Sequence, residues 1–238
     1  MKIAIIGYGR MGKEIEKAAI ARAHEISLII DINNQQDFTP ENLKKADVAI
    51  DFTTPDAVAG NILTCFDADI PVVAGTTGWQ NELKRVTDIC IQKKQALFHA
   101  SNYSIGVNIM FAVNEYLASL MNRFPQYDVS LEEFHHIHKL DSPSGTAITI
   151  ADQIISMIDR KKKWELNTAS SEEALKIKAV REGEIKGIHE VTYDSDVDYI
   201  SLKHFAKSRI GFAFGAVQAA EFIVNKRGVF TMRDLMGL

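Results

Sequence analysis

The chain has 238 residues, of which 46% are hydrophobic and 24% charged, as in ordinary globular proteins. Lysine and arginine number 27 against 31 aspartate and glutamate, so a formal net charge of -4 offers no basic field to a nucleic acid or an anionic membrane. Cys65 and Cys90 form no CxxC pair, and no run approaches the ~20 apolar residues of a membrane span. We expect a cytoplasmic protein with neither nucleic acid nor membrane as a partner.

The first hundred residues alternate short strand-like runs with amphipathic segments of helix length. Strands are expected at 3–6, 26–30, 48–52, 71–74 and 96–98, and helices at 10–23, 55–66 and 81–94. This alternation predicts a parallel sheet covered by helices on both faces. Residues 1–102, rejoined by 213–238 with helices at 215–225 and 232–236, are predicted to form a doubly wound, Rossmann-type α/β domain.

The pattern changes after Asn102. Helices are expected at 105–121 and 144–158, and strands at 128–134, 178–181, 188–193 and 199–205. Turn residues between the last strands favour an open, mostly meandering sheet with helices on one face. We expect residues 103–212 to form an α+β domain with a mixed or antiparallel sheet that binds substrate and mediates assembly. The charge run 160–163 is predicted to be solvated, and 167–173 to be an exposed connection.

A glycine-rich turn, with the sequence GYGRMG at 7–12, follows the first strand and opens a helix. Gly7 permits a tight turn, Gly9 lets the backbone approach a pyrophosphate, and Gly12 allows close packing of helix and strand. Asp31 ends the second strand 19 residues after Gly12, where a carboxylate would bind ribose hydroxyls. The turn therefore predicts a dinucleotide site, and the alternative is a glycine turn needed only for packing.

Two further polar loops, 74–78 and 101–103, follow the fourth and fifth predicted strands. In open α/β sheets ligands bind beyond the carboxyl ends of the strands, so these loops are candidates for the nicotinamide side of a dinucleotide. The alternative is ordinary turn chemistry, because Gly, Thr, Ser and Asn are common after strands for local reasons.

The segment 133–146, EFHHIHKLDSPSGT, contains three of the seven histidines. On an extended chain His136 and His138 point to one side and His135 to the other, so we expect no metal site. A histidine can donate a proton near neutral pH, and Lys139 adds a fixed cation. The helix start 144–146 offers N–H groups and hydroxyls to a carboxylate. We infer a site for a small acidic substrate; the alternative has the histidines satisfying buried backbone groups and Lys139 solvated.

These motifs together resemble the family of bacterial 4-hydroxy-tetrahydrodipicolinate reductase, also called dihydrodipicolinate reductase. The matching blocks span most of the chain in the family's order: 7–12, 51–53 with Pro55, 75–78, 102–104 with 106–108, 133–147, 181–183 with Gly187 and His189, 204–206 with 208–209, and 232–235.

The resemblance implies reduction of 4-hydroxy-tetrahydrodipicolinate with hydride from NADH or NADPH, in lysine and diaminopimelate biosynthesis, by a homotetramer assembled through the second domain. It makes His135 the proton donor and Lys139 a second, substrate-stabilising donor. The implied dicarboxylate contacts are His136, Ser144, Gly145, Thr146 and Arg209. The implied nucleotide contacts are Gly7, Tyr8, Gly9, Arg10, Met11, Gly12, Asp31, Gly75, Thr76, Thr77, Ala100, Ser101, Asn102 and Tyr103.

Cofactor choice follows from Asp31. The five residues after it contain no cation that would bind a 2′-phosphate, so we expect a preference for NADH without exclusion of NADPH. Two other functions remain open. Another Rossmann-type dehydrogenase of the aspartate pathway would share the N-terminal half, and a non-catalytic NAD(H) sensor would need 7–12 and Asp31 but not Lys139 beside the histidines.

Overall fold

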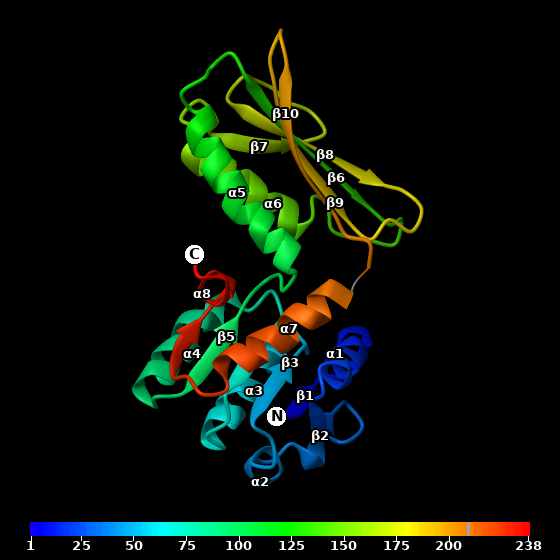
Figure 1. Cartoon of the computed structure of the whole chain (residues 1–238), viewed down its shortest axis with the longest axis vertical. Coiled ribbons are helices and arrows are strands. Elements are labelled where there is room, and N and C mark those ends of the chain that lie inside the picture. The colour runs from blue at the N-terminus through cyan, green and yellow to red at the C-terminus, as the bar shows by residue number, and fades with distance from the viewer. Residues whose placement is uncertain (209) are drawn as a thin grey trace. The chain divides into compact units, whose positions relative to one another are not determined.

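The computed structural model describes residues 1–208 and 210–238 (Figure 1). The chain divides into two compact units, Met1–Ile105 with Ile210–Leu238, and Gly106–Arg209. Among the described residues, none of the helices is long and apolar enough to cross a membrane. Each unit has its own sheet and its own buried core.

The first unit contains a six-stranded parallel sheet in the order β11-β5-β4-β3-β1-β2. Its strands are β1 (Lys2–Ile6), β2 (Glu25–Ile30), β3 (Val48–Asp51), β4 (Val72–Ala74), β5 (Ala96–His99) and β11 (Gly228–Phe230). The direction of winding reverses between β1 and β3. In such sheets this reversal opens a crevice for ligands at the carboxyl ends of the strands.

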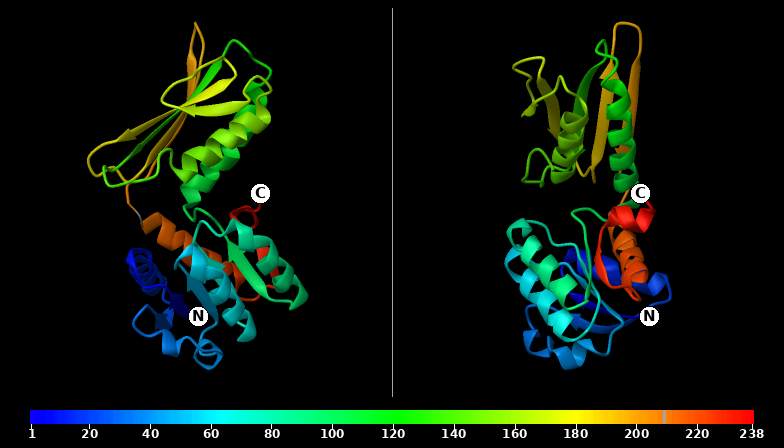
Figure 2. Two further views of the ribbon diagram at one scale, coloured as in Figure 1. Left: turned by 180° about the vertical axis from the view of Figure 1, so that it is seen from behind. Right: turned by 90° about the vertical axis from the view of Figure 1, so that its left-hand side faces the viewer.

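Helices cover both faces of this sheet, as the alternation of strands and helices predicts. They are α1 (Arg10–Ala21), α2 (Pro40–Leu43), α3 (Pro55–Asp67), α4 (Gln80–Gln92), α7 (Ile210–Ile223) and α8 (Met232–Met236), with a 3-10 turn, η1 (Gln35–Asp37). Side chains of β1 alternate between the two cores: Ala4 and Ile6 pack with α3 and α4, whereas Ile3 and Ile5 pack with α1 and α7. In Figure 2 α3 and α4 lie on the opposite side of the sheet from α7.

The second unit contains a five-stranded sheet in the order β10-β9-β6-β8-β7. Its strands are β6 (Asp128–His135), β7 (Lys163–Leu166), β8 (Ala174–Arg181), β9 (Ile188–Asp194) and β10 (Tyr199–Phe205). Strand β9 is antiparallel to β6 and β10, whereas β6, β8 and β7 run parallel. The sheet is therefore mixed, and the expectation of a mostly meandering sheet is wrong.

Helices α5 (Ile105–Met121) and α6 (Gly145–Met157) both pack on one face of this mixed sheet (Figure 2). Their apolar side chains share a core with Val129, Leu131, Ile177, Val191 and Tyr193 of β6, β8 and β9. These strand residues lie opposite one another in register, so one sheet face is buried. The predicted fold class, a Rossmann-type parallel sheet with a second α+β domain, is confirmed.

The charge run 160–163 is solvated in part: Lys162 and Lys163 are exposed, whereas Lys161 is buried. Lys161 is 3% exposed, and its ammonium lies 2.7 Å from Asp128 Oδ1 and donates to the Glu172 and Ala174 carbonyls. Buried ammonium groups are found where such partners replace water. The predicted exposed connection at 167–173 is confirmed, because each of its residues is exposed.

Candidate active site

The glycines at the two ends of the turn 7–12 are required by the packing of the chain itself. Gly7 has a φ of +91°, and its N–H donates to the Ile30 carbonyl over 2.9 Å. A β-carbon on Gly7 would collide with the Phe52 carbonyl oxygen, and one on Gly12 would collide with the Gly7 carbonyl oxygen. These close approaches bring the α1 N-terminus down onto the crevice between β1 and β3.

Gly9 needs a different explanation. A β-carbon there would meet no described heavy atom within 4 Å, and Gly9 is the N-cap of α1 without a side-chain capping bond. Ser, Thr, Asp or Asn would cap the helix better, so the protein's own packing does not call for glycine at this position. Glycine at this position is explained instead by a phosphate that approaches the N–H groups at the start of the helix. The turn therefore fits the pyrophosphate of a dinucleotide.

The other predicted residues of this turn have distinct surroundings. The Tyr8 hydroxyl donates a hydrogen bond to Glu16, Arg10 is exposed at the start of α1, and Met11 packs against the core between α1 and α7. Asp31 lies immediately after β2 and is half-buried. Asn34 accepts a hydrogen bond from the Asp31 N–H at 2.7 Å, and Gln35 donates to the Asp31 carbonyl at 2.9 Å.

The loops that follow β3 and β4 are joined by a buried carboxylate, to which the sequence assigned no role. Asp51 is fully buried and accepts hydrogen bonds from Thr53, Asn61 and Thr76. Burial raises the pKa of the Asp51 carboxyl, and the hydrogen bonds from Asn61, Thr53 and Thr76 oppose that rise. Thr76 is thus a support of the loop, whereas Thr77 beside it is exposed. Gly75 leaves room for the Phe52 ring.

Tyr103, one of the predicted nucleotide contacts, has its side chain in the core of the first unit. Its side chain is 2% exposed, lies against the Phe52 and Phe98 rings, and donates from its hydroxyl to the Ala74 carbonyl at 2.7 Å. This hydrogen bond supports the last residue of β4, Ala74. In the rest of the predicted loop Ser101 is exposed, Ala100 and Asn102 are half-buried, and the Asn102 side chain accepts from the Ser104 N–H at 2.9 Å.

In the second unit, strand register brings together side chains that are far apart in sequence. Glu133 on β6 lies opposite His189 on β9, which lies opposite His204 on β10. His135, two residues after Glu133, lies on the same face of the sheet because side chains alternate along a strand. This face continues the buried core of α5 and α6, so an ionisable cluster lies at the end of an apolar layer.

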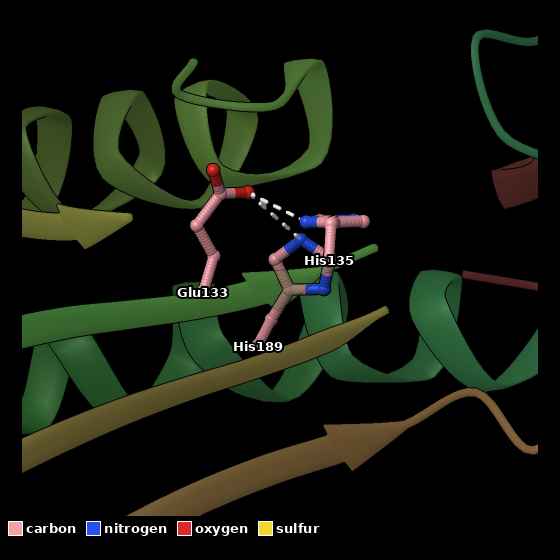
Figure 3. Close-up of side chains that lie close together, drawn as sticks. All are labelled: Glu133, His135 and His189. Atoms are coloured by element: carbon pink, nitrogen blue, oxygen red, sulfur yellow. Dashed lines mark ion pairs between the residues drawn. The ribbon is translucent and has the colours of Figure 1, made fainter. Parts of the chain in front are cut away.

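The centre of this cluster is the Glu133 carboxylate (Figure 3). Its Oε2 lies 3.3 Å from His135 Nδ1 and 3.7 Å from His189 Nε2. Arg181 lies 2.8 Å from Oε1. Burial alone raises the pKa of Glu133, but hydrogen bonds from His135, Ser144 and Arg181 outweigh it and hold the pKa at about 2. Glu133 is therefore ionised at neutral pH.

His189 has the opposite electrostatic character. Burial, followed by the charge of His135, lowers the pKa of His189 to about 3, although the Glu133 charge opposes the change. His189 is therefore neutral at the pH where His135 would act. Its ring lies edge-on to that of His135, with centroids 5.2 Å apart.

The predicted residues after β6 follow a turn toward α6. Lys139 is partly buried, and its ammonium lies 2.8 Å from Asp141 Oδ1. His136 is half-buried and His138 is exposed; their rings lie 5.9 Å apart, and His138 reaches Glu184. Lys139 thus accompanies His135 and His136 at the same strand end.

Ser144 is the N-cap of α6 and is 3% exposed. Its N–H donates to Glu133 Oε1, its Oγ accepts from the Ala147 N–H, and the same Oγ lies 3.1 Å from His189 Nε2. Ser144 therefore links the helix start to the ionisable cluster. Gly145 and Thr146 form the first turn of α6, where helix N–H groups point outward. Arg209 lies outside the described residues.

Glu133, His135 and His189 offer ligand atoms within 4.8 Å of one another, close enough for one metal ion. The carboxylate, however, is already bound by Arg181 and Ser144, and a guanidinium beside a metal ion would be repelled. We assign the cluster to ion pairing. Glu133 and Arg181 are site residues that were not predicted from the sequence, although the apolar alternation along β6 puts Glu133 on the buried face.

Comparisons with known proteins identify the family. The model for "Dihydrodipicolinate reductase, N-terminus" matches residues 1–103, and that for "Dihydrodipicolinate reductase, C-terminus" matches residues 106–236. The 4-hydroxy-tetrahydrodipicolinate reductase of Christiangramia forsetii is 48% identical over 240 residues, covering 99% of this chain and 98% of its own. That of Staphylococcus aureus is 34% identical over 247 residues, covering 99% of this chain and 100% of its own.

A solved structure agrees with these relatives. The dipicolinate-bound dihydrodipicolinate reductase from Paenisporosarcina sp. TG-14 has a TM-score of 0.79 and 25% sequence identity, with 97% of both chains covered. A probable dehydrogenase from Thermotoga maritima, 10% identical with a TM-score of 0.58 over 99% of this chain and 92% of its own, shares the fold. The family and the fold support binding of a pyridine nucleotide. The chain belongs to the dihydrodipicolinate reductase family.

Proposed function

We propose that the chain reduces 4-hydroxy-tetrahydrodipicolinate to tetrahydrodipicolinate, with hydride from a reduced pyridine nucleotide, in lysine and diaminopimelate biosynthesis. The observation that carries this proposal is a buried histidine, His135, with one ring nitrogen facing an ionised carboxylate and the other facing Gly187. A β-carbon on Gly187 would lie 3.2 Å from His135 Nε2. A side chain at position 187 would therefore crowd Nε2, the atom proposed to give the proton.

In the proposed reaction a bound nicotinamide supplies hydride to the conjugated double bond of the cyclic imine that forms when the substrate loses water. His135 then protonates the resulting enamine, so that hydride and proton together saturate one double bond. Lys139 stabilises the anionic side of the substrate as charge develops. His136, Gly145, Thr146 and Arg209 bind the two carboxylates, and Ser144 positions the α6 N-terminus that presents Gly145 and Thr146.

The proposed nucleotide contacts are those of the first unit. Gly7, Tyr8, Gly9, Arg10, Met11 and Gly12 would bind the pyrophosphate, and Asp31 the adenosine ribose. Gly75, Thr77, Ala100, Ser101 and Asn102 would line the nicotinamide side, supported by Thr76 and Tyr103. We propose NADH as the preferred donor, because Asp31 repels a 2′-phosphate and the side chains of Asn34 and Gln35 are engaged by the backbone.

We further propose a cytoplasmic homotetramer. The sheet face opposite α5 and α6 carries Phe134, Ile188 and Phe205, and Tyr199 and Phe205 are 69% and 54% exposed. Exposed apolar sheet surface of this kind favours association between copies. The two free cysteines, Cys65 and Cys90, suit a reducing compartment.

A coupled assay tests the proposed function. The unstable substrate is generated in place by condensing pyruvate with aspartate semialdehyde, and oxidation of NADH or NADPH is followed at 340 nm. Turnover that requires all components supports the proposal. Absence of turnover with freshly condensed substrate would refute it, and turnover with aspartate semialdehyde alone would indicate another dehydrogenase.

A further inference from the structure

The two oxygens of the Glu133 carboxylate have different surroundings. Oε1 accepts hydrogen bonds from the Ser144 N–H at 3.1 Å and from Arg181 Nη2 at 2.8 Å. Oε2 is buried and accepts no bond of ideal geometry from a described residue, although His135 Nδ1 lies 3.3 Å away. One oxygen is therefore anchored, and the other is directed at the imidazoles (Figure 3).

His135 is the natural partner of Oε2. Its Nδ1 is buried and makes no other hydrogen bond to the described part of the chain. His189 Nε2 lies farther from Oε2, at 3.7 Å, and has Ser144 Oγ at 3.1 Å. Catalytic hydrogen bonds are often long in unliganded proteins and shorten when substrate binds. The pairing of Oε2 with His135 Nδ1 thus satisfies two buried polar atoms at once.

We infer that Glu133 is a positioning residue, which keeps a proton on His135 Nδ1 so that the proton given to the substrate leaves from Nε2. This inference rests on the proposed function for the identity of the proton acceptor. In the transfer the Nε2–H bond breaks and a bond from that hydrogen to the reduced substrate forms. His135 passes from the imidazolium to the neutral Nδ1–H tautomer, which Oε2 accepts without rearrangement. Gly187 places no side chain against Nε2.

The other charged and titratable side chains described around His135 do not compete with Glu133 for this positioning role. The charged and titratable side chains around His135 are Arg181 on β8, His189 on β9, His204 on β10, and Lys139 and Asp141 in the loop after β6. Burial lowers the pKa of both His189 and His204, which are therefore neutral. Arg181 holds the opposite oxygen of the same carboxylate, so its charge and that of Glu133 act on His135 with opposite sign.

Substitutions at these two positions give the first test. In Glu133→Gln we expect kcat to fall about 10- to 100-fold, less than loss of the acid itself, with substrate KM changed less than about threefold, as for an interaction made in the transition state. The alkaline limb of the kcat profile should move to lower pH, because the stabilising charge is gone. In Arg181→Gln that limb should move to higher pH. A purely structural role would not produce shifts of opposite sign.

Glu132→Gln is the matched control. Glu132 is the neighbouring residue of β6, lies on the opposite sheet face and pairs with Lys178 at 2.9 Å. The control should keep the wild-type profile. Equal profiles for Glu133→Gln and Glu132→Gln would overturn the inference, as would loss of wild-type activity on chelation with EDTA that zinc restores.

Nitrogen-15 NMR of the histidine rings gives a second test that needs no turnover. For the neutral His135 ring of the wild-type protein we expect the Nδ1–H tautomer, and Glu133→Gln should increase the Nε2–H form. A wild-type Nε2–H tautomer would overturn the inference even if the enzyme turns over. If Glu133→Gln does not fold, the wild-type spectrum decides alone. Failure of the proposed function would appear instead as absence of wild-type turnover.

Discussion

Gly215 on α7 packs directly against the main chain of Tyr103, so closely that a β-carbon on the glycine would collide with the Tyr103 carbonyl oxygen. The small residues of α7, among them Ala216, Ala219 and Ala220, let this helix lie close to the first sheet. Tyr103 in turn supports the end of β4 through its hydroxyl. This contact joins the C-terminal segment of the chain to the loop that follows β5.

Gly215→Ala is therefore expected to destabilise the protein. Overpacking of a core position costs about 1–3 kcal/mol, which urea unfolding measures. Gly211→Ala on the same helix is the control, since its added carbon would meet no other described part of the chain within 4 Å, apart from its neighbours and the helix backbone. That change should be neutral or stabilising by up to about 1 kcal/mol, because alanine favours helix. Equal stability of the two variants would contradict the close contact.

His135→Gln is expected to lower kcat by about 10²- to 10⁴-fold, the range for a positioned general acid. Nucleotide affinity, measured by fluorescence titration, should be unchanged, because the proposed nucleotide contacts belong to the first unit. His138→Gln serves as the control, since its side chain is exposed. An unaltered rate in His135→Gln would exclude this histidine as the proton donor.

Lys139→Ala should both raise the substrate KM and lower kcat. In the proposed reaction it removes a cation that stabilises the dicarboxylate substrate, and that cation becomes more important as negative charge develops in the transition state. Steady-state kinetics at one ionic strength measure both effects. A variant with lower thermal stability but normal kinetics would show that Lys139 only pairs with Asp141.

Cofactor choice can be tested at Asp31. We expect a higher kcat/KM with NADH than with NADPH, and we expect Asp31→Asn to narrow the ratio by about tenfold, corresponding to about 1.4 kcal/mol of charge repulsion. Asp37→Asn, in the same loop, should leave the ratio unchanged. A clear NADPH advantage in the wild-type protein would show that cations from another segment bind the 2′-phosphate.

His189 should make folding stability depend on pH. Because burial lowers its pKa from 6.5 to about 3, the unfolded chain binds a proton below pH 6.5 that the folded protein does not. This contribution is intact above pH 6.5 and is lost between pH 6.5 and 3, with a limiting slope of about 1.4 kcal/mol per pH unit. His189→Gln should flatten the curve between pH 6.5 and 4.5, above the range where Glu133 adds its own dependence. The prediction would be contradicted if the unfolding free energies of the two proteins, measured with urea, fell equally as the pH is lowered over this range.

The helices and strands that could be predicted from the sequence are those with strong periodicity. The helix at 105–121 and the strand at 199–205 have the predicted bounds. Helix α7 begins at Ile210 rather than at Gly215, and Gly215, a residue type that normally weakens a helix, here permits the close approach of the helix to Tyr103. The three-residue strand β11 is too short to show a period, and parallel pairing with β5 stabilises it.

The residues of the site also fall into those that the sequence predicts and those that it does not. His135 and Lys139 follow from local chemistry, because they lie within five residues. His189 and Arg181 come from strands that reach β6 only through tertiary pairing, so periodicity cannot predict their approach to Glu133. The alternation of β6 does place Glu133 on the buried face. The sequence does not show which residue compensates the charge of Glu133.

The register of β9 against β6 has a consequence for refolding experiments. A slip of one residue in this pairing would turn His189 to the opposite face of the sheet and leave Glu133 opposite a different side chain. Such a misfolded species would keep nearly all of its secondary structure, and circular dichroism would hardly distinguish it from the native protein. Recovery of catalytic activity therefore reports correct strand alignment more stringently than recovery of ellipticity.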